Sequence, residues 1–505
     1  MQIMSRRKQR GVLFGGVLLF LMGLASLIYV SPNLVRTSEA AVVTWVGGSS
    51  TWEEGSNWSS GSIPGSNDDV VIDASVTVSL NGPTEVQSLT LGNSSGTTTP
   101  TLNFLYDALS DGALVLSGGD MVVHEGAVIT HGAAVGETEV RRLEIDVQNG
   151  SAYIYGSVLA NGKGYGGGSS ANGNNGLGPG GAGGNCSSTS GGGGGGHGGV
   201  GKSGRDYAGG SAYGSHTLPI DLGSGGGCGR SVMGTGYGGA GGGYIGISAS
   251  DSIDISGIVS VNGGNGYRGG GGGSGGSVYF MAATITGNGS VAANGGNGTS
   301  DTRYGGGGSG GRVMLSYSGD YSYTGTLSAI LGQYGGGGES GMVLVYDVTH
   351  NDLFIKTSQV WHADPSLEGS EHTYRNIEVS DGAVWRLVGY YTDSSDGVGF
   401  VFTVSDFTLH SGSSLNGNGY GYSGGSTTVG NNGLGPGGGI GHCNDGSKGG
   451  GGAGHGGIGK NGRNYAGGGR HMGRILCLLI SEAAVGVVEL LWVRDMEGEA
   501  EELSV

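Results

Sequence analysis

Residues 262–280 read NGGNGYRGGGGGSGGSVYF, and residues 294–315 repeat the pattern as NGGNGTSDTRYGGGGSGGRVML. In both copies a glycine-rich phrase leads through Gly-Ser-Gly-Gly into an alternating strand. Glycine supplies 122 of the 505 residues, against a usual share of about 7%. A repeat of roughly 30 to 35 residues is typical of stacked, quasi-one-dimensional folds. The glycine block from about Gly162 to Gly341 is therefore predicted to be folded.

Two other interpretations of the glycine block were weighed. A flexible linker would lack a pattern, because glycine loses the most backbone entropy on ordering and linkers keep that entropy. Collagen is excluded because the chain has only eight prolines and no strict Gly-X-Y period. Backbones without Cβ atoms can approach closely and bond to one another. We therefore expect extended, polyglycine-II-like segments packed side by side and anchored by the intervening strands, with mobile loops between the strands as the alternative.

The alternation of glycine blocks with short strands resembles two groups of known proteins. It is similar to the glycine-rich ectodomain of anaplastic lymphoma kinase-type receptors. It also resembles the glycine-rich repeat regions of large bacterial surface proteins. No tyrosine kinase follows the blocks, so the resemblance implies no signalling role.

Short alternating strands fill residues 74–160 and 344–416. Residues 143–147 (LEIDV) and 400–404 (FVFTV) are examples. Alternation over four to six residues, broken by Gly, Asn and Ser, predicts half-buried strands. No amphipathic helix of ten or more residues lies between them, so βαβ units are not expected. The predicted fold is all-β, parallel β-helix-like or built of stacked short-strand repeats, with a β-sandwich as the alternative.

The glycine block of residues 161–343 has a second, incomplete copy at 417–468. The phrase GNNGLGPG at residues 430–437 repeats residues 173–180. The phrase HGG(V/I)GK also occurs in both blocks, at residues 197–202 and 455–460. The chain therefore reads as one and a half large units, each a strand-rich region followed by a glycine-rich region.

The first 40 residues are typical of an export signal. Arg6, Arg7, Lys8 and Arg10 precede an uncharged stretch at residues 11–30. Small residues at Ser38 and Ala40 suit cleavage before Ala41. Because twenty helical residues span roughly 30 Å, an uncleaved anchor is the alternative. In both cases residues from 41 onward are predicted to be exported to the cell surface or beyond, with membrane contact only through residues 11–30.

A compact motif at residues 41–73 combines Trp45, Trp52 and Trp58 with a proline and the run DDVVI. It resembles the entry segment of many exported bacterial surface proteins. Tryptophans here can cover the open end of a sheet stack; the functional alternative is sugar stacking on exposed rings. Asp68 and Asp69 are weak Ca²⁺ candidates, because the spacing of calcium loops is missing and a solvated turn before a strand explains them better.

The tail at residues 469–505 has a different composition, apolar and acidic. Read one frame over, the codons from His471 can encode the continuation of the repeat, residues 213–230. We therefore interpret the tail as a shifted reading frame and expect it to be poorly ordered. The prediction is a small insertion or deletion near codon 469, with a glycine-rich continuation in the restored frame. Sequencing the gene across that codon checks it, and a restored frame without such a continuation would contradict it.

Few residues suggest chemistry. Cys186 and Cys228 are predicted to form a disulfide, because the compartment is oxidising; two free thiols are the alternative. His197 and His455 recur with the repeat, but no second ligand stands at zinc spacing beside either. No nucleotide-binding or hydrolase motif occurs in the right context. The net charge of −17 argues against nucleic acid as a partner. No catalytic residue, metal site or cofactor is predicted.

Three functions remain open from the sequence. The leading hypothesis is an exported, repetitive surface protein with a structural or adhesive role and no catalytic site, whose partners would be surface polysaccharide or other surface proteins. The second is a carbohydrate-binding or carbohydrate-cleaving β-helix protein, which would need paired carboxylates in a groove. The third, a receptor-like ligand-binding ectodomain, depends on the glycine resemblance alone.

Overall fold

The structure is a computed structural model that describes residues 40–300, 302–363, 371–391, 397–398, 400–417, 477–480 and 488–491. These residues are almost all β, with parallel sheets and hardly any helix, which confirms the all-β part of the predicted fold. No helix among them is long and apolar enough to cross a membrane. The predicted export segment at residues 1–40 and the second glycine block at 417–468 lie outside the described residues, apart from their boundary positions.

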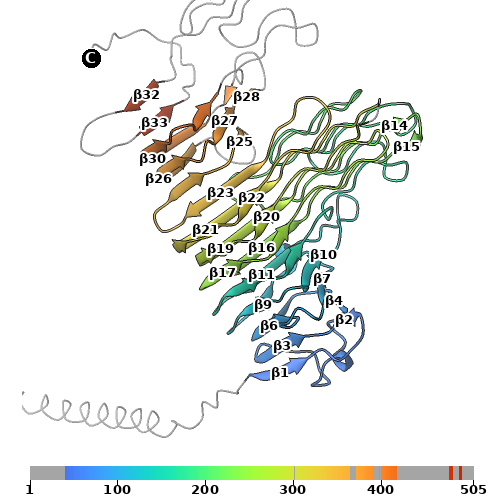
Figure 1. Ribbon diagram of the computed structural model, residues 1–505, viewed down its shortest axis with the longest axis vertical. Helices are drawn as coiled ribbons and strands as arrows, with labels where there is room; N and C mark the ends of the chain where they lie inside the picture. Colours follow the sequence, from blue (N-terminus) through green and yellow to red (C-terminus); the bar gives the residue numbers. More distant parts are fainter. Residues whose placement is uncertain are drawn as a thin grey trace, which may run out of the picture. The chain divides into compact units, whose positions relative to one another are not determined.

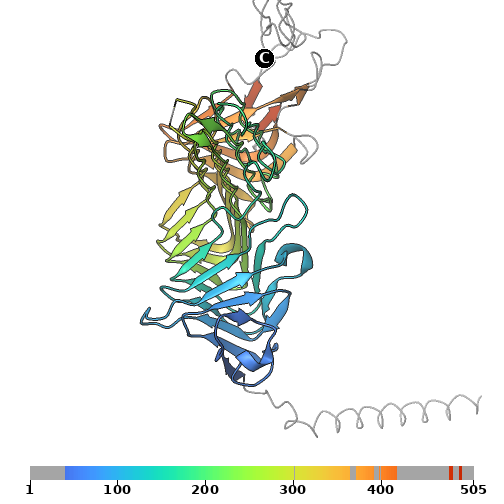
Figure 2. The ribbon, with the colours of Figure 1, turned by 90° about the vertical axis from the view of Figure 1, so that its right-hand side faces the viewer.

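Three parallel sheets run through the first part of the chain, and each turn of the chain adds one strand to each sheet (Figures 1 and 2). The first sheet contains β1 (Ala41–Thr44), β3 (Asp68–Ile72), β6 (Ser88–Leu91), β9 (Met121–Val123), β12 (Ala152–Ile154), β17 (Ser252–Ile255) and the ends of β19 (Ser277–Thr286) and β21 (Arg312–Tyr321). The second contains β2 (Ser50–Thr51), β4 (Thr77–Leu80), β7 (Thr101–Phe104), β10 (Val128–His131), β13 (Ser157–Leu159), β18 (Ile258–Ser260), β20 (Ser290–Ala292) and β22 (Thr326–Ser328). The third contains β5 (Thr84–Val86), β8 (Leu114–Leu116), β11 (Leu143–Val147), β16 (Tyr244–Ala249), the starts of β19 and β21, and β23 (Met342–Asp347).

Strict alternation of side chains directs the hydrophobic residues of all three sheets into one core. In β11, for example, Leu143, Ile145 and Val147 are fully buried, whereas the residues between them are not. Strand pairing keeps like residues in register, so that Ile145 lies beside Leu114 and Ile247. The first stack of coils therefore owes its stability to aliphatic ladders, with each fully buried side chain worth about 1.5–3 kcal/mol. The helices of the described residues are the single-turn helices η1 (Gly55–Asn57) and α2 (Ala108–Asp111).

Each glycine-rich insertion that the structure describes leaves this stack at the same corner, between the second and third sheets. The four insertions are residues 160–243, 261–276, 293–311 and 329–341, and we call them together the glycine bundle. They run beside one another away from the strands (Figure 1), and the first also contains the small hairpin β14 (Arg230–Ser231) and β15 (Gly234–Thr235). The block predicted at residues 161–343 is therefore interleaved with strands β16 to β22, because their apolar residues return to the core.

Strand β23 is shared by two hydrophobic cores. Val343 and Val345 face the first core, whereas Met342 and Leu344 face a second core that contains Trp361 and Trp385. The chain then turns back, and β24 (Asp352–Ile355) pairs antiparallel with β23 and parallel with β26 (Glu371–Val379), which pairs with β30 (Val401–Leu409). In this second part of the fold, β25 (Gln359–His362), β27 (Val384–Val388) and β31 (Ser414–Asn416) form a separate three-stranded parallel sheet. The short strands β28 (Tyr390–Tyr391) and β29 (Gly397–Val398) pair with each other.

The structure describes two strands of the tail, β32 (Cys477–Ile480) and β33 (Val488–Leu491). Strand β33 pairs antiparallel with both β32 and β30. The shifted reading frame of this tail stays a prediction that the gene sequence tests.

Candidate functional site

The three tryptophans of the entry motif lie inside the first coil. Trp45, Trp52 and Trp58 are at most 5% exposed, and Trp58 packs edge-on against both others, with ring centroids 4.9 and 4.7 Å away. The Trp58 indole N–H donates to the Trp52 carbonyl at 2.8 Å. Their ring faces are covered by protein, so none of the three is available to stack on a sugar. The tryptophans instead fill the end of the first core.

Asp68 and Asp69 also have structural partners. The Gly65 N–H donates to Asp68 at 2.8 Å, and the Ser88 hydroxyl donates to Asp69 at 2.5 Å. Both residues begin β3, so they terminate a turn and bridge to the next coil. Across the described residues, no group of three His, Cys, Asp or Glu side chains could hold a metal ion.

Hydrogen bonds in the glycine bundle join neighbouring insertions in several directions. The Gly271 N–H donates to Gly227 of the first insertion at 2.9 Å, and the Gly272 N–H donates to Gly306 of the third at 2.9 Å. Successive residues therefore bond to different neighbours, unlike those of a flat sheet. The stretches 191–199, 222–229, 269–278 and 305–317 are buried throughout. Backbone groups rather than side chains thus make up the interior of the bundle.

Lack of space makes glycine necessary in this interior. A Cβ atom on Gly193, Gly271 or Gly306 would lie closer than 3.0 Å to a backbone oxygen of a neighbouring segment. Real Cβ atoms essentially never approach backbone oxygen so closely. None of these three glycines has the left-handed φ that would itself require glycine.

The structure joins Cys186 and Cys228 by a disulfide, with Cα atoms 5.4 Å apart. Both residues lie in the first insertion and are buried. The Asn185 N–H donates to the Cys228 carbonyl at 3.0 Å, beside the covalent link. The bridge therefore ties together two segments of the bundle that have few side chains with which to pack.

Two buried histidines hold the bundle in place. His131 ends β10, where its Nδ1–H donates to the Gly132 carbonyl at 2.7 Å and its Nε2 accepts from the Tyr244 N–H at 3.2 Å. Tyr244 begins β16, so this bond fixes the point where the longest insertion re-enters the stack. Burial lowers the pKa of His131 to about 4.

His197 lies inside the bundle itself. Its Nδ1 lies 2.9 Å from the Gly275 carbonyl, and its backbone N–H donates to the Ser309 hydroxyl at 2.9 Å. Burial, reinforced by the nearby Arg312 charge, holds the pKa of His197 well below its usual value. The recurrence of this histidine in the sequence thus has a structural explanation in the first block, whereas His455 lies outside the described residues.

Acid is expected to destabilise the fold through His131. Its pKa is about 4 in the folded chain and about 6.5 when unfolded. Between these two pKa values the unfolded state binds a proton at His131 and the folded state does not. Stability therefore falls as the pH drops from about 6.5 to about 4. We expect a loss on the order of 2–3 kcal/mol, measured by denaturant unfolding across this pH range.

His131→Asn, which cannot titrate, should be less stable than the parent at pH 7 but should lose less stability on acidification. His124→Asn serves as the control, because His124 makes no hydrogen bond through its ring within the described part of the chain. Equal pH dependence in the parent and His131→Asn would contradict the assignment.

Two carboxyl groups have raised pKa values, Glu144 on β11 of the third sheet and Asp221 in the first insertion. Burial raises the pKa of Glu144 to about 7, and its carboxylate accepts from the Tyr244 hydroxyl at 2.7 Å. Burial also raises the pKa of Asp221, against the opposing charges of Arg312 and Arg142. Arg142 interacts with both carboxyls and donates to the Ile220 carbonyl at 3.4 Å. A glycosidase requires two such carboxyl groups.

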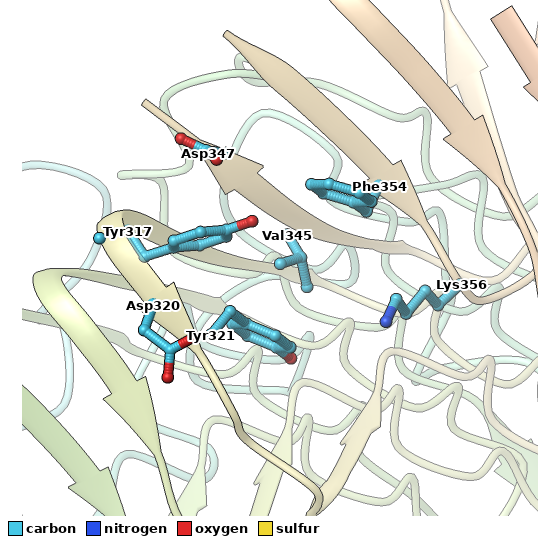
Figure 3. Close-up of a pocket in the computed structure, with 8 residues that line it drawn as sticks. Tyr317, Asp320, Tyr321, Val345, Asp347, Phe354 and Lys356 are labelled. Carbon is cyan, nitrogen blue, oxygen red and sulfur yellow. The ribbon is translucent and has the colours of Figure 1, made fainter. Parts of the chain in front are cut away.

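A hollow of about 300 Å³ lies where β21, β23 and β24 meet. Figure 3 shows the rings of Tyr317, Tyr321 and Phe354 around it, with Asp320 and Lys356 at its rim. The Tyr317 and Tyr321 rings lie 5.5 Å apart at 35°, and the Lys356 ammonium lies 5.7 Å from the centre of the Tyr321 ring. Gly319, Val345 and Asp347 complete the lining.

Sequence reasoning identified neither the hollow nor the two carboxyl groups with raised pKa values. The tyrosines, Phe354 and Lys356 come from strands that the chain reversal brings together. That reversal left no motif in the sequence beyond an ordinary turn at residues 348–351. Alternation alone predicts that Glu144 points outward, but it does not predict what covers it.

Comparison of the chain with protein-family models, with curated proteins and with solved structures gives no match.

Proposed function

We propose that this protein is an exported structural or adhesive element of the cell surface, built as a parallel β-helix that carries polyglycine-II-like insertions. The observation that supports this most is the glycine bundle. Its buried interior consists mainly of backbone groups bonded between insertions, and at many of its glycines a Cβ atom would collide with a neighbouring backbone. Repetition along such an element favours many weak contacts.

The export signal and the composition support the same role. Residues 1–40 have the charge and hydropathy pattern of a signal or anchor. The acidic net charge of −17 favours solubility and disfavours phosphate-rich partners. A disulfide between Cys186 and Cys228 suits an oxidising compartment.

The test is labelling of intact host cells. An antibody raised against the purified full-length chain should stain unpermeabilised cells, and external protease should remove the signal. A matched strain without the gene provides the control for specificity. Staining that requires permeabilisation would overturn the proposal.

A carbohydrate-cleaving protein is the second candidate function, and the raised pKa values of Glu144 and Asp221 favour it. In that role Glu144 would be the general acid, because a carboxyl with a pKa of about 7 is protonated in a large fraction of molecules at neutral pH. Release of reducing ends from polysaccharides by the purified chain would support it. Glu144→Gln should then abolish release, whereas Asp73→Asn, an exposed acid on another coil, should not.

A further inference from the structure

We infer that the hollow formed by Tyr317, Tyr321 and Phe354 is a carbohydrate-binding site that takes one or two sugar rings of a surface polysaccharide. The inference deepens the proposed adhesive role, on which the choice of a surface polymer rests. Pockets for small ligands begin at about 300 Å³, and this hollow has that volume.

The aromatic rings supply the apolar half of such a site. Tyr321 and Phe354 are only partly buried, and both contribute to the lining. A pyranose ring has a face of C–H bonds that packs on an aromatic face, with a rim of hydroxyls around it. The hydroxyl groups of Tyr317 and Tyr321 make no hydrogen bond within the described residues, so they can bond to a ligand.

The charged groups supply the polar half. Asp320 and Lys356 are exposed, and neither forms an ion pair among the described residues. Asp320 can accept hydrogen bonds from sugar hydroxyls, and Lys356 can donate them. Asp347, deeper in the lining, is already bonded to His350 at 2.7 Å, so it shapes the wall.

Other ligand classes fit this mixture less well. A cation would meet the Lys356 ammonium beside the Tyr321 ring. A phosphate would face the Asp320 and Asp347 carboxylates. A wholly apolar ligand would remove charged groups from water without replacing their hydrogen bonds, which is costly. A neutral polyhydroxylated ring satisfies both the aromatic and the charged groups, and a uronic acid would in addition pair with Lys356.

The position of the hollow suits a polymer. The end of β21 pairs with β19 on one edge, and the turn before β24 removes the strand that would cover its other edge. The hollow therefore lies where the first sheet ends and opens at Gly319 and Asp320, which are exposed. A chain of sugars can enter with one or two rings and leave along the surface.

The experiment is binding of oligosaccharides to the purified full-length chain, by glycan array and then by calorimetry with the best neutral and the best uronic-acid oligosaccharide. Tyr321→Ala should weaken binding about tenfold or more, the effect of losing one stacked ring. Asp320→Ala and Lys356→Ala, both at exposed positions, should weaken it several-fold without lowering thermal stability. Tyr304→Ala removes an exposed tyrosine of the glycine bundle that does not line the hollow, and it is the matched control.

Each outcome decides the inference. No binding by the parent chain to any array member at millimolar concentration would overturn it. Full binding by all three variants would also overturn it. If Tyr321→Ala is destabilised but still binds, the inference is wrong and the rings serve to cover the end of the core. Binding is measured on purified protein. A negative result would therefore disprove the carbohydrate site but not the proposed surface location, which the cell-labelling experiment tests separately.

Discussion

Replacing Gly271 by alanine is expected to destabilise the fold by about 3 kcal/mol or more. The added Cβ would point at the Gly193 carbonyl, closer than 3.0 Å. The obstacle is backbone held by its own hydrogen bonds, such as the one from the Gly193 N–H to Gly183 at 2.9 Å. A flexible side chain could move aside, but this carbonyl cannot move without breaking bonds on either side.

Gly166→Ala is the matched control for this substitution. It lies in the same bundle, yet its Cβ would meet only the side chains of Leu177 and Asn172, at 3.6 and 3.7 Å, which are ordinary contacts. Gly166→Ala should therefore change stability by less than about 1 kcal/mol, because it also reduces the entropy of the unfolded chain. Denaturant unfolding of both variants measures the difference, and equal effects would show that close backbone packing does not hold the bundle together.

Amide hydrogen exchange tests the same point by another route. In the parent chain, the amides of Gly226, Gly227, Gly271 and Gly272 should exchange slowly, because each is buried and bonded to a neighbouring segment. In Gly271→Ala their protection should be lost, while the amides of β11 keep theirs. Exchange as fast as in an unstructured peptide in the parent chain would leave the glycine-rich stretches as loops between strands.

Loss of the Cys186–Cys228 disulfide is expected to cost about 4 kcal/mol. The bridge closes a loop with a sequence separation of 42 residues, and chain-entropy reasoning gives about 3 to 4 kcal/mol for loops of this length. The bundle depends on this disulfide more than an ordinary hydrophobic core would, because its segments bury few apolar side chains. The expected effect therefore falls on the bundle before it reaches the aliphatic ladders of the first stack.

Cys186→Ser, Cys228→Ser and the double variant should all lose the same free energy, since each removes the same bond. Their unfolding should be insensitive to reducing agents, whereas that of the parent chain should shift. Mass spectrometry of unreduced peptides provides the check on the bond itself. Two unlinked cysteine peptides from the parent chain would contradict the bridge.

Short sequence patterns predicted much of the architecture. Alternation in segments such as LEIDV at residues 143–147 predicted strands with one buried face, and the structure has that pattern in β11. Patterned glycine predicted ordered segments, and the described insertions are bonded to one another. From the sequence, the tryptophans could either cap the sheet stack or form a sugar-binding surface, because the sequence does not show whether their rings are buried. The structure buries Trp45, Trp52 and Trp58, which decides between the two.

The chain's own sequence thus determined the all-β class, the alternation of its strands and the need for glycine, since each is a property of a few neighbouring residues. Tertiary structure alone decided that four insertions leave at one corner and pack together, and that Tyr317, Tyr321 and Phe354 surround one hollow. It also decided that His131 fixes the return of the longest insertion at Tyr244. These arrangements join residues up to 139 positions apart, as in the bond from the Val200 N–H to Glu339. Contacts at such separations depend on how many residues each coil contains and where the chain reverses, which no local pattern records.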